Sequence, residues 1–204
     1  MITIVDYGVG NISAFKNVFK RLNIASSIAK SSSDLENATK LILPGVGSFD
    51  YAMSQLNLSG MRKKLDELVI EKKIPVLGIC VGMQMMGKGS EEGASEGLNW
   101  IDAQVLKFDE SLLKTRVKLP HMGWNEVKPV KESILFKNIN EEAIFYFLHS
   151  YYFKCKNSNH VLGVSDYGSS FSSCINFENI YGVQFHPEKS HNNGEKLLHN
   201  FALI

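Results

Sequence analysis

The sequence lacks the features that mark secreted, membrane-bound or nucleic-acid-binding proteins. Its three cysteines form no Cys-x-x-Cys pair and no obvious disulfide framework, which favours a reducing compartment and predicts a cytoplasmic protein. Lysine and arginine total 22 against 21 for aspartate and glutamate, so a net charge of +1 gives no reason to expect nucleic acid or a membrane as a partner. No apolar run is long enough to cross a membrane, and the opening residues MITIVDYGVGN lack the basic start of a secretory signal.

The sequence does contain enough apolar material for one folded domain. Of its 204 residues, 44% are hydrophobic and 21% are charged, which fits a single α/β domain spanning residues 1–204. No internal repeat, low-complexity tract or proline-rich linker divides the chain. We therefore expect one domain.

The first half alternates short strands with helical patterns. Three runs of β-type residues, 2–7, 40–44 and 74–80, are separated by segments whose apolar residues recur at helical spacing. Asn11 is suited to cap the first helix and Ser48 the second. This βαβ order predicts parallel strands with helices on both faces of a sheet.

After about residue 97 the pattern changes to strands, followed by a closing helix over 193–204. The strand-rich segments are 98–108, 124–130, 145–153, 160–168, 169–177 and 180–187. We therefore expect a mixed, mostly parallel central sheet.

Cys80 falls where the strand 74–80 gives way to a helical pattern. The segment Gly78-Ile79-Cys80-Val81-Gly82 has the spacing of the G-x-S-x-G nucleophile turn, with sulfur in place of oxygen. Glycines at both ends of such a turn avoid collisions with the neighbouring strand and helix. A free cysteine is also among the most often buried residues, so the motif alone leaves a nucleophile and a core residue equally open.

The segment GVQFHPEKSH offers a base for such a nucleophile. His186 precedes Pro187, which favours extended backbone, so His186 and Glu188 project to the same side. Glu188 can then hold one imidazole nitrogen and leave the other for a thiol, as in a catalytic triad. The alternatives are a solvated His-Glu pair, or zinc bound by His186, Glu188 and His191, whose spacing matches no known zinc signature.

Glycine-rich segments follow two other strands. Residues 44–47, Pro-Gly-Val-Gly, can present backbone N–H groups to a ligand, but no Gly-Lys-Ser/Thr follows, so they form no phosphate-binding P-loop. Gly8 and Gly10 begin a dinucleotide fingerprint that Ser13 interrupts, so a simple strand-to-helix turn is the better interpretation.

Together these segments resemble the class I, triad-type glutamine amidotransferases, and among them the glutaminase subunits of imidazole glycerol phosphate synthases. The resemblance covers essentially the whole chain. It is carried by DYGVGN, LPGVGSF, GICVGMQ, SEEG, LPHMGWNEV, FYFLHSYY and GVQFHPEKS. It implies a flavodoxin-like α/β fold.

The resemblance also implies a role for each matching residue. Cys80 would be the nucleophile, His186 the general base and acid, and Glu188 the residue that orients His186. The N–H groups of Val81 and of the Val46-Gly47 turn would form the oxyanion hole. The residues that match the substrate pocket are Gly47, Gln84, Glu92, His149, Ser150 and Tyr151.

The reaction implied is the hydrolysis of glutamine through a cysteinyl thioester, with no metal or organic cofactor. In the family the released ammonia enters a (β/α)8-barrel cyclase subunit, which forms imidazole glycerol phosphate and an aminoimidazole carboxamide ribotide. The implied assembly is a heterodimer. Asn11, Trp124 and Lys189 match its interface, and Met122 is a neighbouring apolar candidate; a buried core position is the alternative for Trp124.

Two segments depart from the common pattern of the family. Val81 stands where leucine is more usual, and Gly-Lys-Gly at 87–89 replaces a bulkier, more acidic stretch. These features are closer to paralogous glutaminase subunits that supply ammonia for surface-sugar amidation, which is an alternative pathway. A stand-alone γ-glutamyl cysteine hydrolase and a non-catalytic scaffold are the remaining hypotheses, and the intact Cys80, His186 and Glu188 argue against the scaffold.

Overall fold

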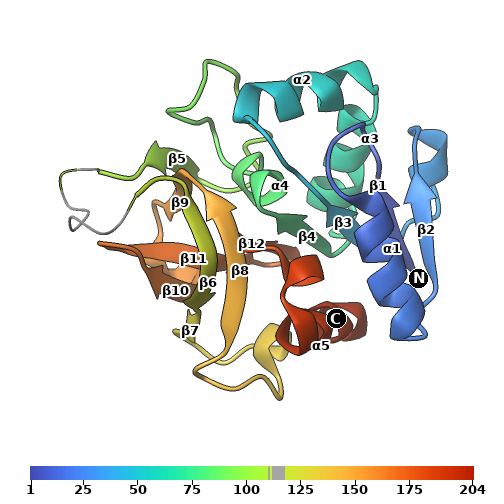
Figure 1. Ribbon diagram of the computed structural model, residues 1–204. Coiled ribbons are helices and arrows are strands. Elements are labelled where there is room, and N and C mark those ends of the chain that lie inside the picture. The colour runs from blue at the N-terminus through green and yellow to red at the C-terminus, as the bar shows by residue number, and fades with distance from the viewer. Residues whose placement is uncertain (110, 112–117) are drawn as a thin grey trace.

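A large mixed sheet runs through the middle of the protein (Figure 1). The structure, a computed structural model, describes residues 1–109, 111 and 118–204, and ten strands of this part form the sheet. The parallel strands, in their order across the sheet, are β2 (Ser26–Ala29), β1 (Ile2–Val5), β3 (Leu41–Leu43), β4 (Val76–Ile79) and β12 (Ile180–Val183). The antiparallel strands are β11 (Ser170–Phe177), β10 (Val161–Asp166), β7 (Lys128–Pro129), β9 (Tyr151–Cys155) and β5 (Ala103–Lys107). The predicted mixed, mostly parallel central sheet is confirmed, with the parallel strands forming one half of it.

Two further strands form a sheet of their own. They are β6 (His121–Glu126) and β8 (Ile144–His149), which pair antiparallel. Phe147 of β8 contacts Phe171 of β11 edge to face, so the small sheet packs on the antiparallel half of the large one (Figure 1).

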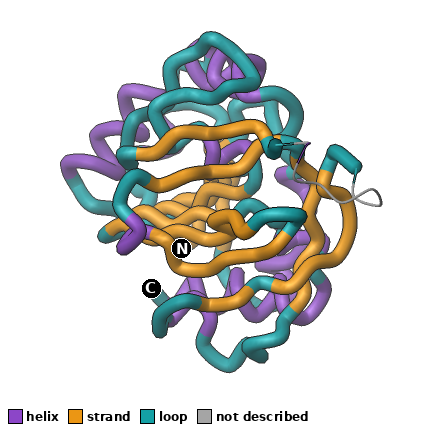
Figure 2. The backbone as a smooth tube through the Cα atoms, turned by 90° about the vertical axis from the view of Figure 1, so that its left-hand side faces the viewer, coloured by secondary structure: helices purple, strands orange, loops and turns teal. Residues whose placement is uncertain are grey.

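Helices cover both faces of the parallel strands (Figures 1 and 2). They are α1 (Ile12–Arg21), α2 (Phe49–Leu58), α3 (Arg62–Asp66), α4 (Val81–Gln84) and α5 (His191–Leu203), with a π-helical segment η2 (Glu67–Glu71) continuing α3. Short 3-10 turns are η1 (Ser33–Leu35), η4 (Ile134–Phe136), η5 (Ser158–His160) and η6 (Pro187–Lys189). From β1 the chain crosses outward to β2, whereas from β3 it crosses the other way to β4. Because such crossovers are right-handed, α1 lies on one face and α2 and α3 on the other.

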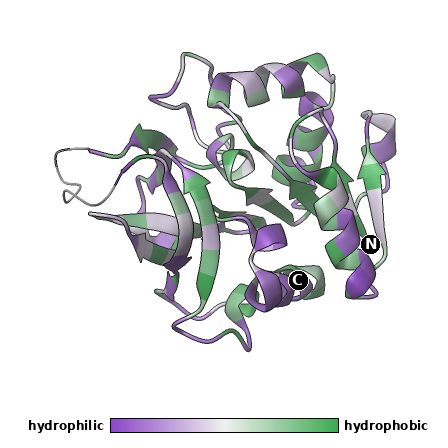
Figure 3. Cartoon of the chain, viewed as in Figure 1, coloured by the Kyte–Doolittle hydropathy of each residue, from purple (hydrophilic) through white to green (hydrophobic). Residues whose placement is uncertain are grey.

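The core lies between these layers. Strands β1, β3 and β4 are buried along their whole length, and the apolar side of α1 contributes Phe15 and Phe19. The hydrophobic residues gather in the central strands and on the inward sides of the helices (Figure 3). Burying each large apolar side chain stabilises the fold by about 1.5–3 kcal/mol.

Some sequence predictions differ from the structure. The edge strand β2 is not predicted, because its sequence SSIA offers little apolar signal and only Ala29 is buried. The segment 98–108 is a strand only within β5, and the closing helix begins at His191. Ser48 precedes α2, but its side chain makes no capping hydrogen bond. Asn11 does cap α1, because its side chain accepts a hydrogen bond from the Ala14 N–H.

The order of the strands predicts where a ligand can bind. The crossover direction reverses between β1 and β3, and open α/β sheets bind ligands beside the carboxyl ends of strands at such a point. The segment that begins at Pro44 follows β3, Cys80 follows β4, and His186 lies just beyond β12. The three sequence motifs therefore meet at one edge of the sheet.

Candidate active site

Cys80 lies in the sharp turn between β4 and α4. Its φ of 54° and ψ of −113° lie outside the regions that L-residues favour. A Cβ on Gly78 would lie 2.8 Å from the Met83 Cα, and a Cβ on Gly82 would lie 2.0 Å from the Leu43 carbonyl oxygen. The predicted strand-to-helix turn is confirmed, and its two glycines are required by close packing.

The His186 imidazole is held between Cys80 and Glu188. Its Nδ1 lies 2.8 Å from Glu188 Oε1, and its ring lines the cavity together with Cys80. Since Nδ1 donates to the carboxylate, Nε2 is left for the sulfur. Burial alone lowers the pKa of His186, but the electrostatic interactions with Cys80 and Glu188 outweigh burial and raise that pKa above its ordinary value. The arrangement favours an imidazolium between the sulfur and the carboxylate.

Ser190 fixes the backbone around His186, a role that the sequence reasoning missed. Its Oγ donates to the His186 carbonyl at 2.6 Å and accepts from the Tyr146 N–H at 2.9 Å. The His186 N–H in turn donates to the Tyr146 carbonyl at 2.8 Å. The segment that carries the imidazole is therefore joined to β8 on both sides of His186.

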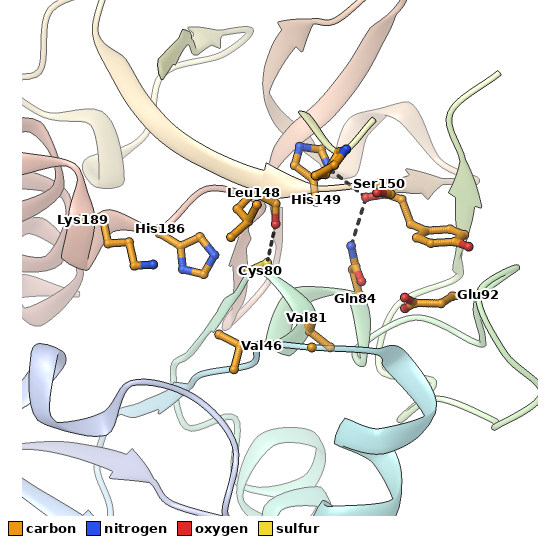
Figure 4. A pocket seen from close by; sticks show the side chains of 13 residues that line it. Val46, Cys80, Val81, Gln84, Glu92, Leu148, His149, Ser150, His186 and Lys189 are labelled. Atoms are coloured by element: carbon orange, nitrogen blue, oxygen red, sulfur yellow. Dashed lines mark hydrogen bonds between the residues drawn. The ribbon is translucent and has the colours of Figure 1, made fainter. Parts of the chain in front are cut away.

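A cavity of about 310 Å³ opens above Cys80 (Figure 4). Eleven of its lining residues are those named from the sequence: Val46, Gly47, Cys80, Val81, Gln84, Glu92, His149, Ser150, Tyr151, His186 and Lys189. Pro120 and Leu148 complete the lining and were not anticipated. Glu188 does not line the cavity but contacts His186 Nδ1, as we expect of a residue that orients the imidazole. Cys80 is only 3% exposed, so it is both packed in the core and open to the cavity.

Gln84 uses both of its amide hydrogens within the protein. Its Nε2 donates to the Tyr151 carbonyl and to Gln184 Oε1, each at 3.1 Å. Only Oε1 of Gln84 is left to accept a hydrogen bond from a molecule in the cavity. Gln184 was missed by the sequence reasoning, although it lies two residues before His186 in GVQFHPE.

Glu92 lies at the start of α2. Its Oε2 accepts a hydrogen bond from the Phe49 N–H at 2.8 Å, which satisfies a donor that the helix leaves unpaired. The carboxylate also lines the cavity. A negative group with one oxygen still open suits a ligand ammonium.

The Pro-Gly-Val-Gly turn faces Val81 across the cavity. Gly47 has a φ of +84°, and a Cβ on Gly45 would lie 2.2 Å from the Gly82 nitrogen, so the turn packs directly on the start of α4. The buried Tyr7 hydroxyl donates to the Pro44 carbonyl at 2.6 Å and anchors the beginning of the turn. Two backbone segments, the turn and the start of α4, thus line the cavity beside Cys80.

An exposed apolar face adjoins the cavity. Trp124 is 46% exposed and Met122 is 65% exposed, so the alternative of a buried core position for Trp124 is wrong. The Trp124 ring stacks on His191 with centroids 5.1 Å apart, and Lys189 Nζ lies 5.6 Å from the Tyr146 ring centre. Asn11 is exposed and uses its side chain to cap α1.

A buried pair of histidines supports the wall of the cavity, and His121 was not anticipated. His121 Nδ1 lies 2.9 Å from His149 Nε2, while His149 Nδ1 lies 2.8 Å from the Tyr151 carbonyl. A carbonyl only accepts, so His149 carries its hydrogen on Nδ1 and His121 donates to His149. Burial lowers the pKa of His121 to about 4. Burial, then the neighbouring His121, lower the pKa of His149 to about 3 despite its bond to Tyr151. Both rings are therefore neutral near pH 7.

Comparison with known proteins agrees with this geometry. Residues 3–204 match the family "Glutamine amidotransferase class-I". The chain belongs to the class I glutamine amidotransferases. It is 53% identical to "Imidazole glycerol phosphate synthase subunit HisH" of Bdellovibrio bacteriovorus and 50% identical to the protein of that name in Leptospira interrogans, and each match covers 100% of both chains. It is 46% identical to "Imidazole glycerol phosphate synthase subunit HisH 2" of Pseudomonas aeruginosa, over 99% of this chain and 98% of that one.

Solved structures share the class I glutamine amidotransferase fold. A crystal structure of a glutamine amidotransferase matches with a TM-score of 0.74 at 16% identity, covering 100% of this chain and 99% of the other. The structure of PurLQS from Thermotoga maritima matches with a TM-score of 0.72 at 16% identity, covering 98% and 96%. The fold expected from the resemblance is confirmed.

Within this amidotransferase, every helix of the described residues is too short or too polar to span a membrane. Its three cysteines, Cys80, Cys155 and Cys174, are all free. Burial raises the pKa of the Cys155 and Cys174 thiols, so neither is a competing nucleophile.

Proposed function

We propose that this class I glutamine amidotransferase is the glutaminase subunit of an imidazole glycerol phosphate synthase. It hydrolyses glutamine to glutamate and ammonia and passes the ammonia to a (β/α)8-barrel cyclase subunit in histidine biosynthesis. The proposal rests on one observation above all: Cys80 and His186 line the same cavity, and the Nδ1 of His186 is held by Glu188. The full-length relatives named imidazole glycerol phosphate synthase subunits support the choice of pathway.

The reaction has two steps in this proposal. The Cys80 thiolate attacks the side-chain carbonyl carbon of glutamine, and His186 gives its Nε2 proton to the departing ammonia, which leaves a γ-glutamyl thioester. His186 then takes a proton from water, the resulting hydroxide attacks the thioester, and glutamate leaves with regeneration of the thiolate. Glu188 keeps the Nδ1 hydrogen in place throughout, so Nε2 always faces the sulfur.

The negative charge on the substrate oxygen needs donors in both steps. We assign this role to the Val81 N–H and an N–H of the Val46-Gly47 turn, because both segments line the cavity beside Cys80. Removing one such donor from an enzyme typically costs about 10²–10³ in kcat.

Substrate glutamine is held at its two ends in this proposal. Glu92 receives the α-ammonium group, because its carboxylate lines the cavity and has one oxygen open. The free Oε1 of Gln84 accepts from the substrate. The backbone of residues 149–151 closes the remaining side of the cavity.

The exposed face around Met122 and Trp124 is where we place the barrel subunit, in a cytoplasmic heterodimer. Leu148 links this face to the cavity, since its side chain is 38% exposed and its residue lines the cavity. Lys189 also lines the cavity and lies next to Tyr146, and Asn11 lies on the exposed start of α1. A partner covering these residues would receive ammonia without its passing through bulk water.

Glutamine hydrolysis by the isolated chain, with and without the cyclase barrel encoded in the same genome, tests this proposal. We expect slow hydrolysis alone and strong stimulation by the barrel. Rapid unassisted turnover would instead favour a stand-alone γ-glutamyl hydrolase, and stimulation only by a barrel from a sugar-amidation pathway would favour the paralogous function. With Cys80→Ala in the complex, glutamine-dependent synthesis should stop while synthesis from high ammonium continues; loss of both would contradict the division of labour.

A further inference from the structure

Gln184 is a completely buried polar side chain in direct contact with the sulfur of Cys80. It is 0% exposed, and its Nε2 lies 3.7 Å from Cys80 Sγ, within the range of an N–H···S hydrogen bond. Its Oε1 accepts from Gln84 Nε2 at 3.1 Å. One amide therefore touches both the nucleophile and the residue that we expect to grip the substrate.

The orientation of the Gln184 amide follows from its neighbours. The Tyr151 carbonyl can only accept, so the group that Gln84 turns toward it must be the NH₂. The second hydrogen of that NH₂ points at Gln184, which must then present its oxygen to Gln84. The Gln184 nitrogen is thereby directed at Cys80 as a donor. The sulfur also faces one acceptor, the Leu148 carbonyl, to which Sγ donates at 3.8 Å when it carries a hydrogen (Figure 4).

The Tyr151 carbonyl is fixed from its other side by the histidine pair. His149 Nδ1 donates to it at 2.8 Å, and His121 and Asn125 continue the chain of hydrogen bonds to the Asp166 carbonyl. From Asn125 onward the donors point toward Tyr151, while the second hydrogen of the Asn125 amide goes to the Asp166 carbonyl. Neither histidine ring can turn over without breaking its hydrogen bond to the next member.

We propose that Gln184 is a positioning residue for the glutaminase reaction, holding the Cys80 sulfur with its N–H group and Gln84 with its oxygen. The inference rests on the proposed function and adds a residue to its machinery. An N–H donor stabilises a thiolate more than a thiol, because hydrogen bonds to charged groups are the stronger ones. Gln184 therefore favours the reactive form of Cys80 and fixes Gln84 at the same time.

The test is Gln184→Met, which keeps the length of the side chain and removes both polar groups. The pH dependence of Cys80 alkylation by iodoacetamide, read on the Cys80 peptide by mass spectrometry, reports the pKa of the thiol. We expect this pKa to rise by roughly half a unit to one unit, which lowers the alkylation rate by about three- to tenfold on the acidic side of the titration. For glutamine hydrolysis we expect kcat to fall, because Cys80 loses a hydrogen-bond donor that favours its reactive form. We expect KM to rise, because Gln84 is no longer held in place.

The matched control and a second variant keep the outcome clear. Gln104 is exposed on β5, and Gln104→Met should leave the alkylation profile and the kinetics unchanged. Gln184→Glu keeps the shape of the side chain but replaces its amide nitrogen with a carboxylate oxygen. Because the sulfur then faces a negative acceptor in place of a donor, we expect a larger rise in the Cys80 pKa. If both Gln184 variants keep the wild-type melting temperature and the wild-type alkylation profile, the positioning role is wrong.

The two proposals fail in different ways. Alkylation of Cys80 requires no glutamine, so it measures the contact with Gln184 even if the wild-type complex hydrolyses none. Absence of glutamine hydrolysis in the wild type would contradict the proposed function and leave the thiol measurement valid. An unchanged alkylation profile in an active enzyme would contradict the role of Gln184 alone.

Discussion

Glu188 Oε1 accepts a hydrogen bond of 2.8 Å from His186 Nδ1, and the two side chains are only 2% and 4% exposed. A buried carboxylate is costly unless it is paired, so this contact both stabilises Glu188 and selects the imidazole tautomer. The neighbouring Ser190 fixes the backbone on which His186 lies. Tautomer and position are thus set by two different residues, and each can be tested separately.

Glu188→Gln tests the selection of the tautomer. The amide nitrogen can donate to Nδ1 and so place the imidazole hydrogen on Nε2, where it faces the sulfur and prevents His186 from acting as a base. We expect kcat for glutamine hydrolysis in the complex to fall by about 10²–10⁴ with little change in KM. Glu178→Gln, which removes an exposed partner of Lys73, is the control that should retain activity. A Glu188→Gln enzyme with full kcat would exclude the orienting role.

Ser190→Ala tests the fixing of the backbone. The change leaves the Tyr146 N–H without its acceptor and the His186 carbonyl without its donor. We expect the free energy of unfolding to fall by about 1–3 kcal/mol, the usual cost of a lost buried hydrogen bond, and kcat to fall as His186 moves. Urea denaturation and steady-state kinetics measure the two effects. The control Ser54→Ala lies on the exposed side of α2 and should change neither; equal behaviour of the two variants would contradict the prediction.

These residues also show how far the sequence could lead. Cys80, His186 and Glu188 were predicted because their spacing lies within short local motifs. Gln184 touches Cys80 across 104 positions of the chain, a contact that no local pattern contains.

Strand β2 escaped prediction for a related physical reason. It is an edge strand with polar serines, and it is held by parallel pairing with β1 rather than by its own apolar pattern. The helix caps were predicted from residue type alone, which was right for Asn11 and wrong for the side chain of Ser48. At the start of α2 the Phe49 N–H is satisfied by Glu92, which comes from a distant loop that no local pattern connects to this helix.

Stability toward acid should depend on the buried histidine pair. The folded-state pKa values of His121, about 4, and His149, about 3, lie below the value of about 6.5 for a free histidine. The unfolded chain therefore binds more protons as the pH falls below about 6.5, and folded-state stability decreases down to the folded pKa values. Above about pH 6.5 the pair contributes its full stability.

His121→Phe should flatten this dependence. The phenyl ring can keep the stacking of His121 between Phe147 and Tyr167 while removing one of the two groups that titrate. Urea denaturation between pH 7 and 4 measures the slope of the unfolding free energy, which we expect to be smaller in the variant than in the wild type. His199→Phe, at an exposed position of α5, should retain the wild-type slope. A variant His121→Phe with the wild-type slope would show that other groups govern the acid transition.

Trp124→Ala tests the partner face. The side chain is 46% exposed and stacks on His191 at the surface, so its removal should change the unfolding free energy of the isolated chain little. Tryptophan at the centre of an interface commonly contributes about 2–4 kcal/mol to binding, and we therefore expect the Kd for the barrel subunit to rise by about 30- to 1,000-fold. Calorimetric titration of the two purified subunits measures it, and stimulation of glutamine hydrolysis should require correspondingly more barrel. The control is Leu58→Ala, an apolar residue that is 78% exposed on α2 and away from this face. If Trp124→Ala and Leu58→Ala bind the barrel as tightly as the wild type, the barrel contacts some other surface of this amidotransferase.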